Sequence, residues 1–176
     1  IADLEIEDEF KKNGDIGVVE VKGPNVFKGY WKKPEKTKCE FRDDGYFITG
    51  DMGFLDQNNY LTIVGRNKDL IITGGLNVYP KEIETVIDQD NNVEESAVVG
   101  VSHPDFGEGI LAIIVKKKGH RINIDTLNEA LRKNLAAFKL PKKIHVIKEL
   151  PRNSMGKVQK NVLRDIYRDE FSDTNK

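Results

Sequence analysis

The segment Gly65–Glu84 constrains the fold of this chain more than any other part of the sequence. A run rich in β-branched residues, Tyr60–Val64, comes directly before it and is typical of a β-strand. Near its end, Pro80 occupies a position that the first turn of a helix tolerates. Several charged residues and the pair Gly74 and Gly75 stand between, and paired glycines indicate positive φ or a close backbone approach. The segment therefore predicts a strand, a junction, a glycine turn and a helix in succession.

The part of the chain before this junction is predicted to be β structure. Gly17–Lys22 and Tyr60–Val64 are short strand-like runs, and Asp56–Asn59 has the composition of a turn. Lys32–Phe41 is polar with scattered apolar residues, which favours a short helix or a loop over a strand. Residues 1–65 therefore read as a β-rich region without an obvious core of their own.

The pattern changes after Lys68. The helix that starts near Pro80 has apolar residues at helical spacing, at positions Ile83, Val86 and Ile87. Ser96–Val101 and Ile110–Val115 are continuous apolar runs of strand length, the form expected of strands that are buried on both faces. We expect these two strands to form the centre of a sheet.

Two more helices and a strand are predicted towards the end of the chain. Thr126 and Glu129 have the spacing of a capping box, which predicts the start of a helix that ends near Phe138. Ile144–Ile147 predicts a strand, and Asn161 can cap a last helix. The apolar stripes of these helices are Leu127, Leu131 and Leu135, and Val162, Leu163, Ile166 and Tyr167. We therefore predict a β-rich part over residues 1–67 and a small α+β domain, with a mixed sheet and packed helices, over residues 68–176.

Composition excludes several classes of function. The 176 residues are 38% hydrophobic and 32% charged, as in soluble globular proteins. Lys and Arg number 28 against 29 Asp and Glu, so the basic excess expected of a nucleic-acid-binding protein is missing. No apolar run approaches the roughly 18 residues of a membrane span. The single cysteine, Cys39, fits a reducing compartment, and we expect a cytoplasmic protein.

Three local patterns suggest chemistry that their context does not support. Gly156 and Lys157 lack the upstream glycine and the following Ser or Thr of a phosphate-binding P-loop. Gly107–Ala112 matches the dinucleotide pattern G-x-G-x-x-A, but a strand-like run follows where that motif requires a helix, so a tight turn explains its glycines. The three histidines are far apart, without cysteines or carboxylates at zinc-ligand spacing, and predict no metal site.

Three ordered motifs resemble those of one enzyme superfamily. Tyr46–Asp51, Gly65–Glu84 and Pro151–Lys157 are similar to motifs of the adenylate-forming enzymes, which include acyl-CoA synthetases, luciferases and peptide-synthetase adenylation domains. The resemblance covers nearly the whole chain but only the C-terminal third of such an enzyme. It implies that residues 68–176 form a mobile C-terminal lid domain and that residues 1–67 are the β-rich end of the large N-terminal domain.

The resemblance assigns adenylation and ATP binding to three residues. Lys157 would reach over the active site during adenylation, where a cation stabilises the negative charge that develops at the α-phosphate. Asp51 would accept hydrogen bonds from the ribose hydroxyls of ATP, and Arg66 would bind near the ribose. Without the resemblance, Lys157 would be an ordinary surface lysine, Thr49–Asp51 a turn with a capping aspartate, and Arg66 one partner of a surface ion pair.

The second half-reaction is assigned to the junction and the glycine turn. Lys68 resembles the hinge of the superfamily, where a few residues at the end of an element absorb a domain rotation. Gly74 and Gly75 would line the passage for the pantetheine arm of CoA. A plain hairpin turn accounts for these two glycines equally well.

The function implied by the resemblance is that of an ATP-dependent acyl-CoA synthetase. A small carboxylic acid and ATP would give an acyl-adenylate, and the CoA thiol would then displace AMP. The segments Val21–Trp31 and Gly74–Glu82 look most like those of malonyl-CoA synthetases. ATP, CoA and Mg²⁺ are the expected cofactors. The ligand for Mg²⁺, the phosphate loop and the acid pocket are expected in the preceding large domain, so residues 1–176 alone should not catalyse.

Two alternatives remain open. An adenylation domain could charge a carrier protein in place of CoA, and a flanking carrier domain would indicate that function. A non-catalytic interaction module could also retain this fold. The presence of Asp51, Arg66 and Lys157 together argues against the module, because an interaction module has no physical need for all three.

Overall fold

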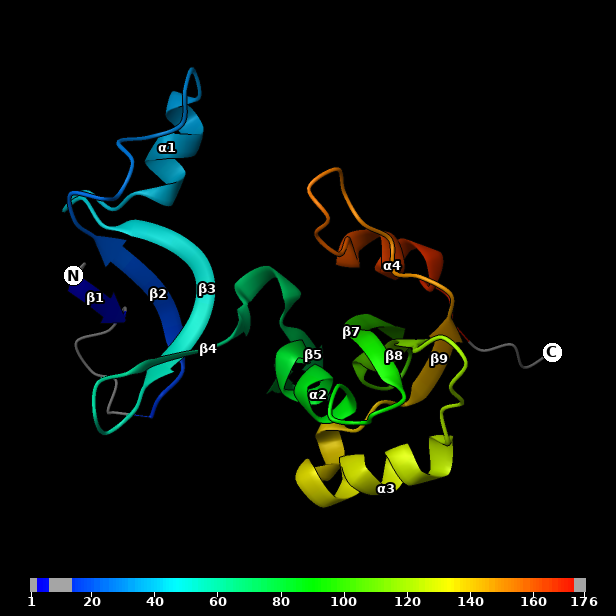
Figure 1. The fold of residues 1–176 in the computed structure, drawn as a ribbon. Helices are drawn as coiled ribbons and strands as arrows, with labels where there is room; N and C mark the ends of the chain where they lie inside the picture. Colours follow the sequence, from blue (N-terminus) through cyan, green and yellow to red (C-terminus); the bar gives the residue numbers. More distant parts are fainter. Residues whose placement is uncertain (1–2, 7–13, 173–176) are drawn as a thin grey trace. The chain divides into compact units, whose positions relative to one another are not determined.

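The computed structural model describes residues 3–6 and 14–172 and divides the chain into two compact units, Ile1–Lys68 and Asp69–Lys176 (Figure 1). No helix in these described ranges is long and apolar enough to cross a membrane. Each unit is built around its own sheet, and we describe the two in turn.

In its described residues, unit 1, Ile1–Lys68, is an antiparallel sheet with one short helix. Its strands follow the order β1-β2-β3-β4 and are β1 Asp3–Ile6, β2 Gly17–Lys22, β3 Phe47–Leu55 and β4 Leu61–Arg66. The helix α1, Pro34–Glu40, lies between β2 and β3 in the sequence (Figure 1). The predicted strand at 17–22 is confirmed, and of the two interpretations of residues 32–41, a short helix or a loop, the structure shows the short helix. The nine-residue strand β3 was not predicted, because polar residues and glycines interrupt its apolar pattern.

Unit 2, Asp69–Lys176, contains a mixed sheet with helices on both faces, which confirms the α+β fold class. After the 3-10 turn η1, Asn67–Asp69, the strands are β5 Ile71–Thr73, β6 Leu76–Val78, β7 Val93–His103, β8 Gly107–Lys116 and β9 Lys143–Ile147. The helices are α2 Pro80–Ile87, α3 Ile124–Asn134 and α4 Lys160–Ile166, with the 3-10 turn η2 at Ala137–Lys139. β8 pairs antiparallel with β5 and β7 and parallel with β9.

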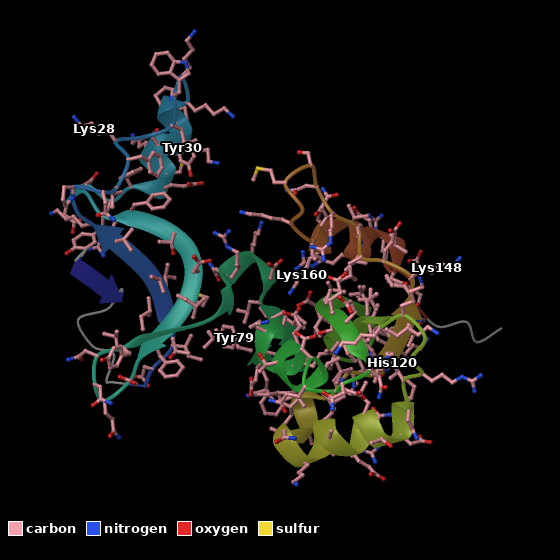
Figure 2. All side chains as sticks on the ribbon, viewed as in Figure 1. Lys28, Tyr30, Tyr79, His120, Lys148 and Lys160 are labelled. Carbon is pink, nitrogen blue, oxygen red and sulfur yellow. The ribbon has the colours of Figure 1, made fainter. Side chains whose placement is uncertain are left out.

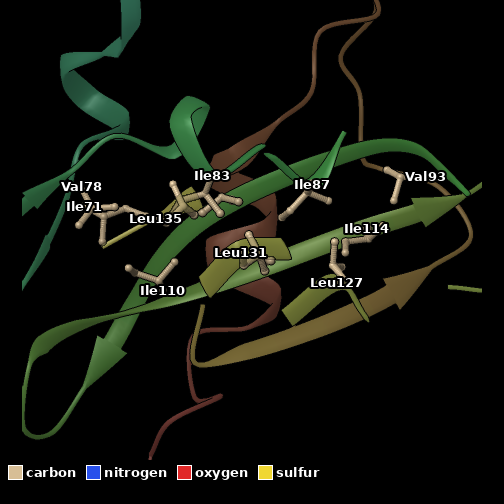
Figure 3. Close-up of a cluster of buried hydrophobic side chains, with 12 residues drawn as sticks. Ile71, Val78, Ile83, Ile87, Val93, Ile110, Ile114, Leu127, Leu131 and Leu135 are labelled. Carbon is tan, nitrogen blue, oxygen red and sulfur yellow. The ribbon is translucent and has the colours of Figure 1, made fainter. Parts of the chain in front are cut away.

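Alternate residues of β7 and β8 build two hydrophobic cores, one on each face of the sheet. On the first face, α2 and α3 cover the sheet (Figure 3); the buried residues there include Ile83, Ile87, Val98, Ile110, Ile114, Leu127 and Leu131. On the second face, α4 and the two rings of Tyr167 and Phe171 pack against the sheet; the buried residues there include Ala97, Val99, Leu111, Ile113, Leu150 and Leu163. Both strands are therefore buried on both faces, as the continuous apolar runs predict.

The predicted position of β7 at the centre of the sheet was wrong. The central strand is β8, whereas β7 forms the last strand of the order β6-β5-β8-β7 among the described residues. A strand that is apolar on both faces is covered by helices above and below. Such cover does not require a partner strand on each edge. The periodicity of the sequence could not make that distinction.

The predicted helix caps were also wrong. The N-cap of α3 is Asn123, whose side-chain oxygen accepts hydrogen bonds from the backbone N–H groups of Asp125 and Thr126, so Thr126 lies inside the helix. This helix ends at Asn134, and the separate turn η2 follows before Pro141. The last helix begins at Lys160 after Gln159, which leaves Asn161 within its first turn. In each case the cap lies one or more residues earlier than predicted.

The buried stripe of α4 is narrower than predicted. Leu163 is buried, and Val162 and Tyr167 are half-buried, but Ile166 is 63% exposed. The residue that completes this face comes from beyond the helix: the ring of Phe171 packs against Gly109, where any Cβ would collide with it. The absence of a side chain at Gly109, near the start of β8, therefore makes room for the ring of Phe171.

A charged contact holds the same C-terminal segment to β9. Lys143 Nζ lies 3.0 Å from Glu170 Oε1, and the ring of His145 stacks on Tyr167. The pKa of Glu170 lies below its ordinary value, chiefly because Lys143 donates a hydrogen bond to its carboxylate, with a smaller contribution from His145. Because the folded-state pKa is lowered, this contact stabilises the fold above the ordinary carboxyl pKa. Its contribution is lost as the pH falls through the folded-state value.

One carboxylate, that of Glu84, connects three elements of unit 2, and its removal should lower the stability of the fold. Glu84 on α2 is 7% exposed; its Oε1 accepts a hydrogen bond from Val98 N at 2.9 Å and lies 2.6 Å from Lys160 Nζ. We expect Glu84→Ala to lower the free energy of unfolding by about 3 kcal/mol, because it leaves a buried N–H group and a shielded ammonium without their acceptor. Urea denaturation measures this change. Glu84→Gln, which keeps an acceptor oxygen, and the exposed Glu129→Ala should each cost less, and equal losses in all three variants would contradict the assignment.

Candidate functional site

Asp51 and Arg66 lie on neighbouring strands of unit 1 and form an ion pair. They are directly paired in the antiparallel register of β3 and β4. Arg66 Nε lies 3.0 Å from Asp51 Oδ1, and Arg66 Nη2 donates a hydrogen bond to the carbonyl oxygen of Thr49 at 2.6 Å. The side chains of Arg66 and Asp51 are 48% and 36% exposed, so the pair is open to solvent. The structure thus brings two of the predicted site residues together, and the contact that it shows is a surface ion pair.

The backbone around Asp51 is a strand with an unusual residue in it. The interpretation of Thr49–Asp51 as a turn with a capping aspartate was wrong, because all three residues belong to β3. Thr49 Oγ1 donates a hydrogen bond to the carbonyl oxygen of Val19 at 2.8 Å and accepts one from Asp51 N at 3.0 Å. Gly50 has φ +73°, and a Cβ there would lie 3.3 Å from Arg66 Nη2. Glycine therefore permits both the positive φ within the strand and the approach of the guanidinium.

The ion pair has the chemistry to receive a ligand with hydroxyl groups. An ionised carboxylate accepts hydrogen bonds at two oxygens, and the guanidinium offers five N–H donors in a planar fork. Exposed ion pairs contribute little to stability, so exchanging part of the Asp51–Arg66 contact for a ligand costs little. Thr49 is the residue that sequence reasoning missed: its hydroxyl fixes the backbone of Asp51, and its place two residues before the aspartate was the available signal.

Lys68 lies in the short turn that joins the two units. It is exposed and occupies the middle of η1. Asn67 separates it from the end of β4, and Asp69, the first residue of unit 2, follows it directly. Its position at the boundary between two separately packed units is what a hinge requires. The hinge role of Lys68 stays a prediction.

Gly74 and Gly75 form the turn of the β5–β6 hairpin. Their φ angles are +57° and +79°, in the left-handed region that favours glycine, and Gly74 N donates a hydrogen bond to the carbonyl oxygen of Phe106 at 2.8 Å. A Cβ at Gly75 would meet no atom within 4 Å. The hairpin geometry accounts for both glycines by conformation, and the turn is open on the Gly75 side. A role in guiding pantetheine stays a prediction.

Lys157 lies on an exposed hairpin between Leu150 and α4. Arg152 and Val158 form an isolated antiparallel bridge, and Asn153 N donates a hydrogen bond to the carbonyl oxygen of Lys157 at 3.0 Å. The tip turns at Gly156, whose φ is +78°. Within the described residues the ammonium group of Lys157 has no ion-pair partner, so the loop presents a cation on a long side chain to solvent.

Two neighbours that sequence reasoning missed stiffen this hairpin. The guanidinium of Arg152 donates to the carbonyl oxygen of Gly156 at 2.6 Å and pairs with the carboxylate of Glu95 on β7. The side-chain oxygen of Asn153 accepts a hydrogen bond from Lys157 N at 2.9 Å. Sequence offered only a weak signal for these roles, namely an arginine and an asparagine at the start of a Gly-containing loop. They hold the backbone of Lys157 in place while its side chain stays exposed.

The described part of the chain provides no metal centre. Among residues 3–6 and 14–172, no group of three or more His, Cys, Asp or Glu side chains is arranged to hold an ion. Cys39 is an exposed free thiol. The expectation that a Mg²⁺ ligand lies outside this chain stays a prediction.

The α+β fold of unit 2 agrees with that of the small C-terminal domain of the adenylate-forming enzymes. Residues 82–157 match the family described as "AMP-binding enzyme C-terminal domain". The chain therefore belongs to the AMP-binding, adenylate-forming enzymes and carries their C-terminal domain, which confirms the predicted superfamily.

Individual relatives agree with this assignment. The chain is similar to ATP-bound MatB from Rhodopseudomonas palustris, with 56% identity and a TM-score of 0.87, over 97% of this chain and 35% of that one. It is similar to o-succinylbenzoate CoA synthetase from Bacillus subtilis with its acyl-adenylate intermediate, with 34% identity and a TM-score of 0.86, over 93% and 34%. It is 43% identical to a putative acyl–CoA ligase of Bacillus subtilis strain 168, over 86% of this chain and 30% of the relative. The chain thus spans about a third of these proteins.

Proposed function

We propose that the protein to which this chain belongs is an ATP-dependent acyl-CoA synthetase. The observation that carries the proposal is the exposed cation of Lys157 on a braced hairpin, within a domain that matches the AMP-binding C-terminal family. The similarity to an ATP-bound enzyme and to a CoA synthetase in complex with an acyl-adenylate supports the same chemistry. In this proposal Mg²⁺ and the residues that bind the phosphates and the acid belong to the large domain of the protein.

The first half-reaction uses Lys157 and the Asp51–Arg66 pair. A carboxylate oxygen of the acid attacks the α-phosphorus of ATP, and the bond to the β-phosphate bridging oxygen breaks, which releases pyrophosphate. Negative charge collects on the oxygens around the α-phosphorus, and the ammonium of Lys157 stabilises it without transferring a proton. Asp51 accepts hydrogen bonds from the ribose hydroxyls, and Arg66 holds the carboxylate in position at 3.0 Å.

The second half-reaction uses the hinge and the glycine turn. The sulfur of CoA attacks the acyl carbonyl carbon, and the bond to the AMP oxygen breaks, which gives the thioester and AMP. Rotation at Lys68 replaces the Lys157 hairpin by the Gly74 and Gly75 turn at the reacting centre. Because neither glycine carries a side chain, this turn leaves room for the narrow pantetheine arm.

Malonate is the acid that we propose. The support is the similarity at 56% identity to MatB, a malonyl-CoA synthetase. This support reflects common ancestry, since the acid pocket is expected in the large domain. A carrier-protein thiol in place of CoA is the alternative acceptor.

The test is acid-dependent exchange of labelled pyrophosphate into ATP, followed by thioester formation. We expect the full-length protein to exchange pyrophosphate with malonate present and to form malonyl-CoA when CoA is added. Residues 1–176 alone should give no exchange above buffer, because the phosphate loop and acid pocket are expected elsewhere. A panel of small mono- and dicarboxylic acids serves as the control for the acid. Exchange by residues 1–176 would contradict the proposal that the large domain holds the phosphate loop and the acid pocket. If the thioester formed only on a carrier protein, that protein and not CoA would be the acceptor.

A further inference from the structure

The helix α4, which directly follows the Lys157 hairpin, depends on tertiary contacts for its position. It contains seven residues, too few for a helix to be stable by itself. Its one fully buried side chain is Leu163, and its first residue, Lys160, labelled in Figure 2, lies 2.6 Å from Glu84 of α2. The hairpin closes onto the start of this helix, because Gln159 N donates a hydrogen bond to the carbonyl oxygen of Pro151 at 2.8 Å. Whatever fixes α4 therefore also fixes the base of the hairpin.

A second ion pair joins α4 to the start of unit 2. Arg164 Nη2 lies 2.7 Å from Asp69 Oδ1, and the two side chains are only 30% and 16% exposed. The neighbouring pair on the same helix, Arg168 with Asp165, is 71% and 67% exposed at 3.1 Å. Shielding makes the Arg164 pair costly to break, whereas the exposed pair contributes little. Of the two arginines, Arg164 is the one that holds the helix.

The position of Asp69 in the chain gives its ion pair with Arg164 a role beyond stability. It is the first residue of unit 2 and follows Lys68 directly. We infer that Arg164 is a positioning residue for adenylation. Its ion pair with Asp69 holds the residue directly after Lys68, so that the pivot stops there, and its place on α4 fixes the base of the Lys157 hairpin. The inference rests on the proposed function. Rotation at Lys68 then carries the lysine with it as part of a rigid body, and a positional error of about 1 Å at a catalytic group can cost about 10²-fold in rate.

The glycine turn is held by contacts that do not involve Arg164. The strands β5 and β6 pair with each other, and Gly74 N donates to the carbonyl oxygen of Phe106. Ile72 N donates to Glu108 Oε2 at 2.6 Å, which fastens β5 to β8. Loss of the Arg164 contact should therefore loosen the lysine hairpin and leave the Gly74 and Gly75 turn in place. A defect confined to adenylation is the signature of the positioning role.

The experiment compares the two half-reactions in full-length variants. Arg164→Met keeps most of the apolar stem and removes the charged donor. We expect it to slow single-turnover adenylation at least about tenfold, and to leave CoA transfer from pre-formed acyl-adenylate within about twofold. The matched control is Arg168→Met on the same helix, which should change neither rate. The charge-reversed pair, Asp69→Arg with Arg164→Asp, should recover most of the adenylation rate that either single reversal loses.

Thermal melting identifies any variant that fails to fold. If Arg164→Met does not fold, Arg164→Lys replaces it, because lysine keeps the positive charge but has one ammonium group, with a shorter reach, in place of the guanidinium. Equal losses in both half-reactions, or no recovery in a well-folded charge-reversed pair, would show that Arg164 is only structural. Lys157→Ala separates this outcome from failure of the proposed function. If Lys157→Ala slows adenylation and Arg164→Met does not, the positioning role is overturned and the proposed function stands. If neither variant affects adenylation, both are overturned.

Discussion

Lys157→Ala in the full-length protein should slow adenylation by at least ~10²-fold, the usual cost of removing one preorganised electrostatic group. The thioester step should change far less, because in the proposed mechanism the lysine acts where charge develops at the α-phosphorus. The structure adds a reason for a clean effect: the backbone of Lys157 is held by Asn153 Oδ1 at 2.9 Å and the hairpin by Arg152, so removing the side chain leaves its support intact. Single-turnover formation of acyl-adenylate, and transfer to CoA from supplied acyl-adenylate, measure the two rates.

Two companion variants sharpen this result. Lys148→Ala removes an exposed lysine of the same unit, labelled in Figure 2, and should leave both rates unchanged. Lys157→Gln, which removes the charge as acetylation does, should resemble Lys157→Ala. Equal losses in the two half-reactions for a folded Lys157→Ala variant would remove Lys157 from its assigned role.

Sequence periodicity predicted the strands β7 and β8 and the helices α2 and α3 of unit 2 because burial there is regular. The strands β7 and β8 bury alternate residues against helices on both faces, so their sequences are continuously apolar, and the helices α2 and α3 show one apolar stripe each. Periodicity does not indicate from which backbone N–H group a side chain accepts a hydrogen bond. Asn123 and Thr126 are both acceptable cap residues, and the choice depends on where the chain enters the helix.

The candidate site was predictable only in part for a similar reason. The motifs indicated Asp51, Arg66 and Lys157, but the contacts that hold these residues come from distant parts of the chain. Thr49 reaches the carbonyl oxygen of Val19, and Arg152 reaches Glu95 on another strand. Such contacts do not follow any periodicity of the sequence, so the partners become visible only when the fold brings them together.

Lys68→Pro should separate the two half-reactions. If one face of the small domain supplies Lys157 and another supplies the glycine turn, rotation at Lys68 must occur between the steps. Proline fixes φ near −65° and disfavours the helical region for the preceding residue, Asn67, which lies in η1. The junction then loses freedom at two consecutive residues, while the shielded pair of Asp69 with Arg164 keeps the next residue fixed. We expect adenylation to survive and CoA transfer to fall, on the hypothesis that the resting orientation of the protein is the one that receives ATP and acid.

The control is Lys68→Ala, which removes the side chain but leaves the backbone free, and it should retain both half-reactions. Thermal melting of the full-length variants first establishes that Lys68→Pro is folded, since a misfolded junction would lower both rates without any hinge. Single-turnover kinetics then distinguish the possibilities. A folded Lys68→Pro variant that adenylates but no longer transfers to CoA places the pivot at this residue, because only the step that needs the second orientation is lost. A folded variant with both rates unchanged would show that the rotation occurs elsewhere in the chain.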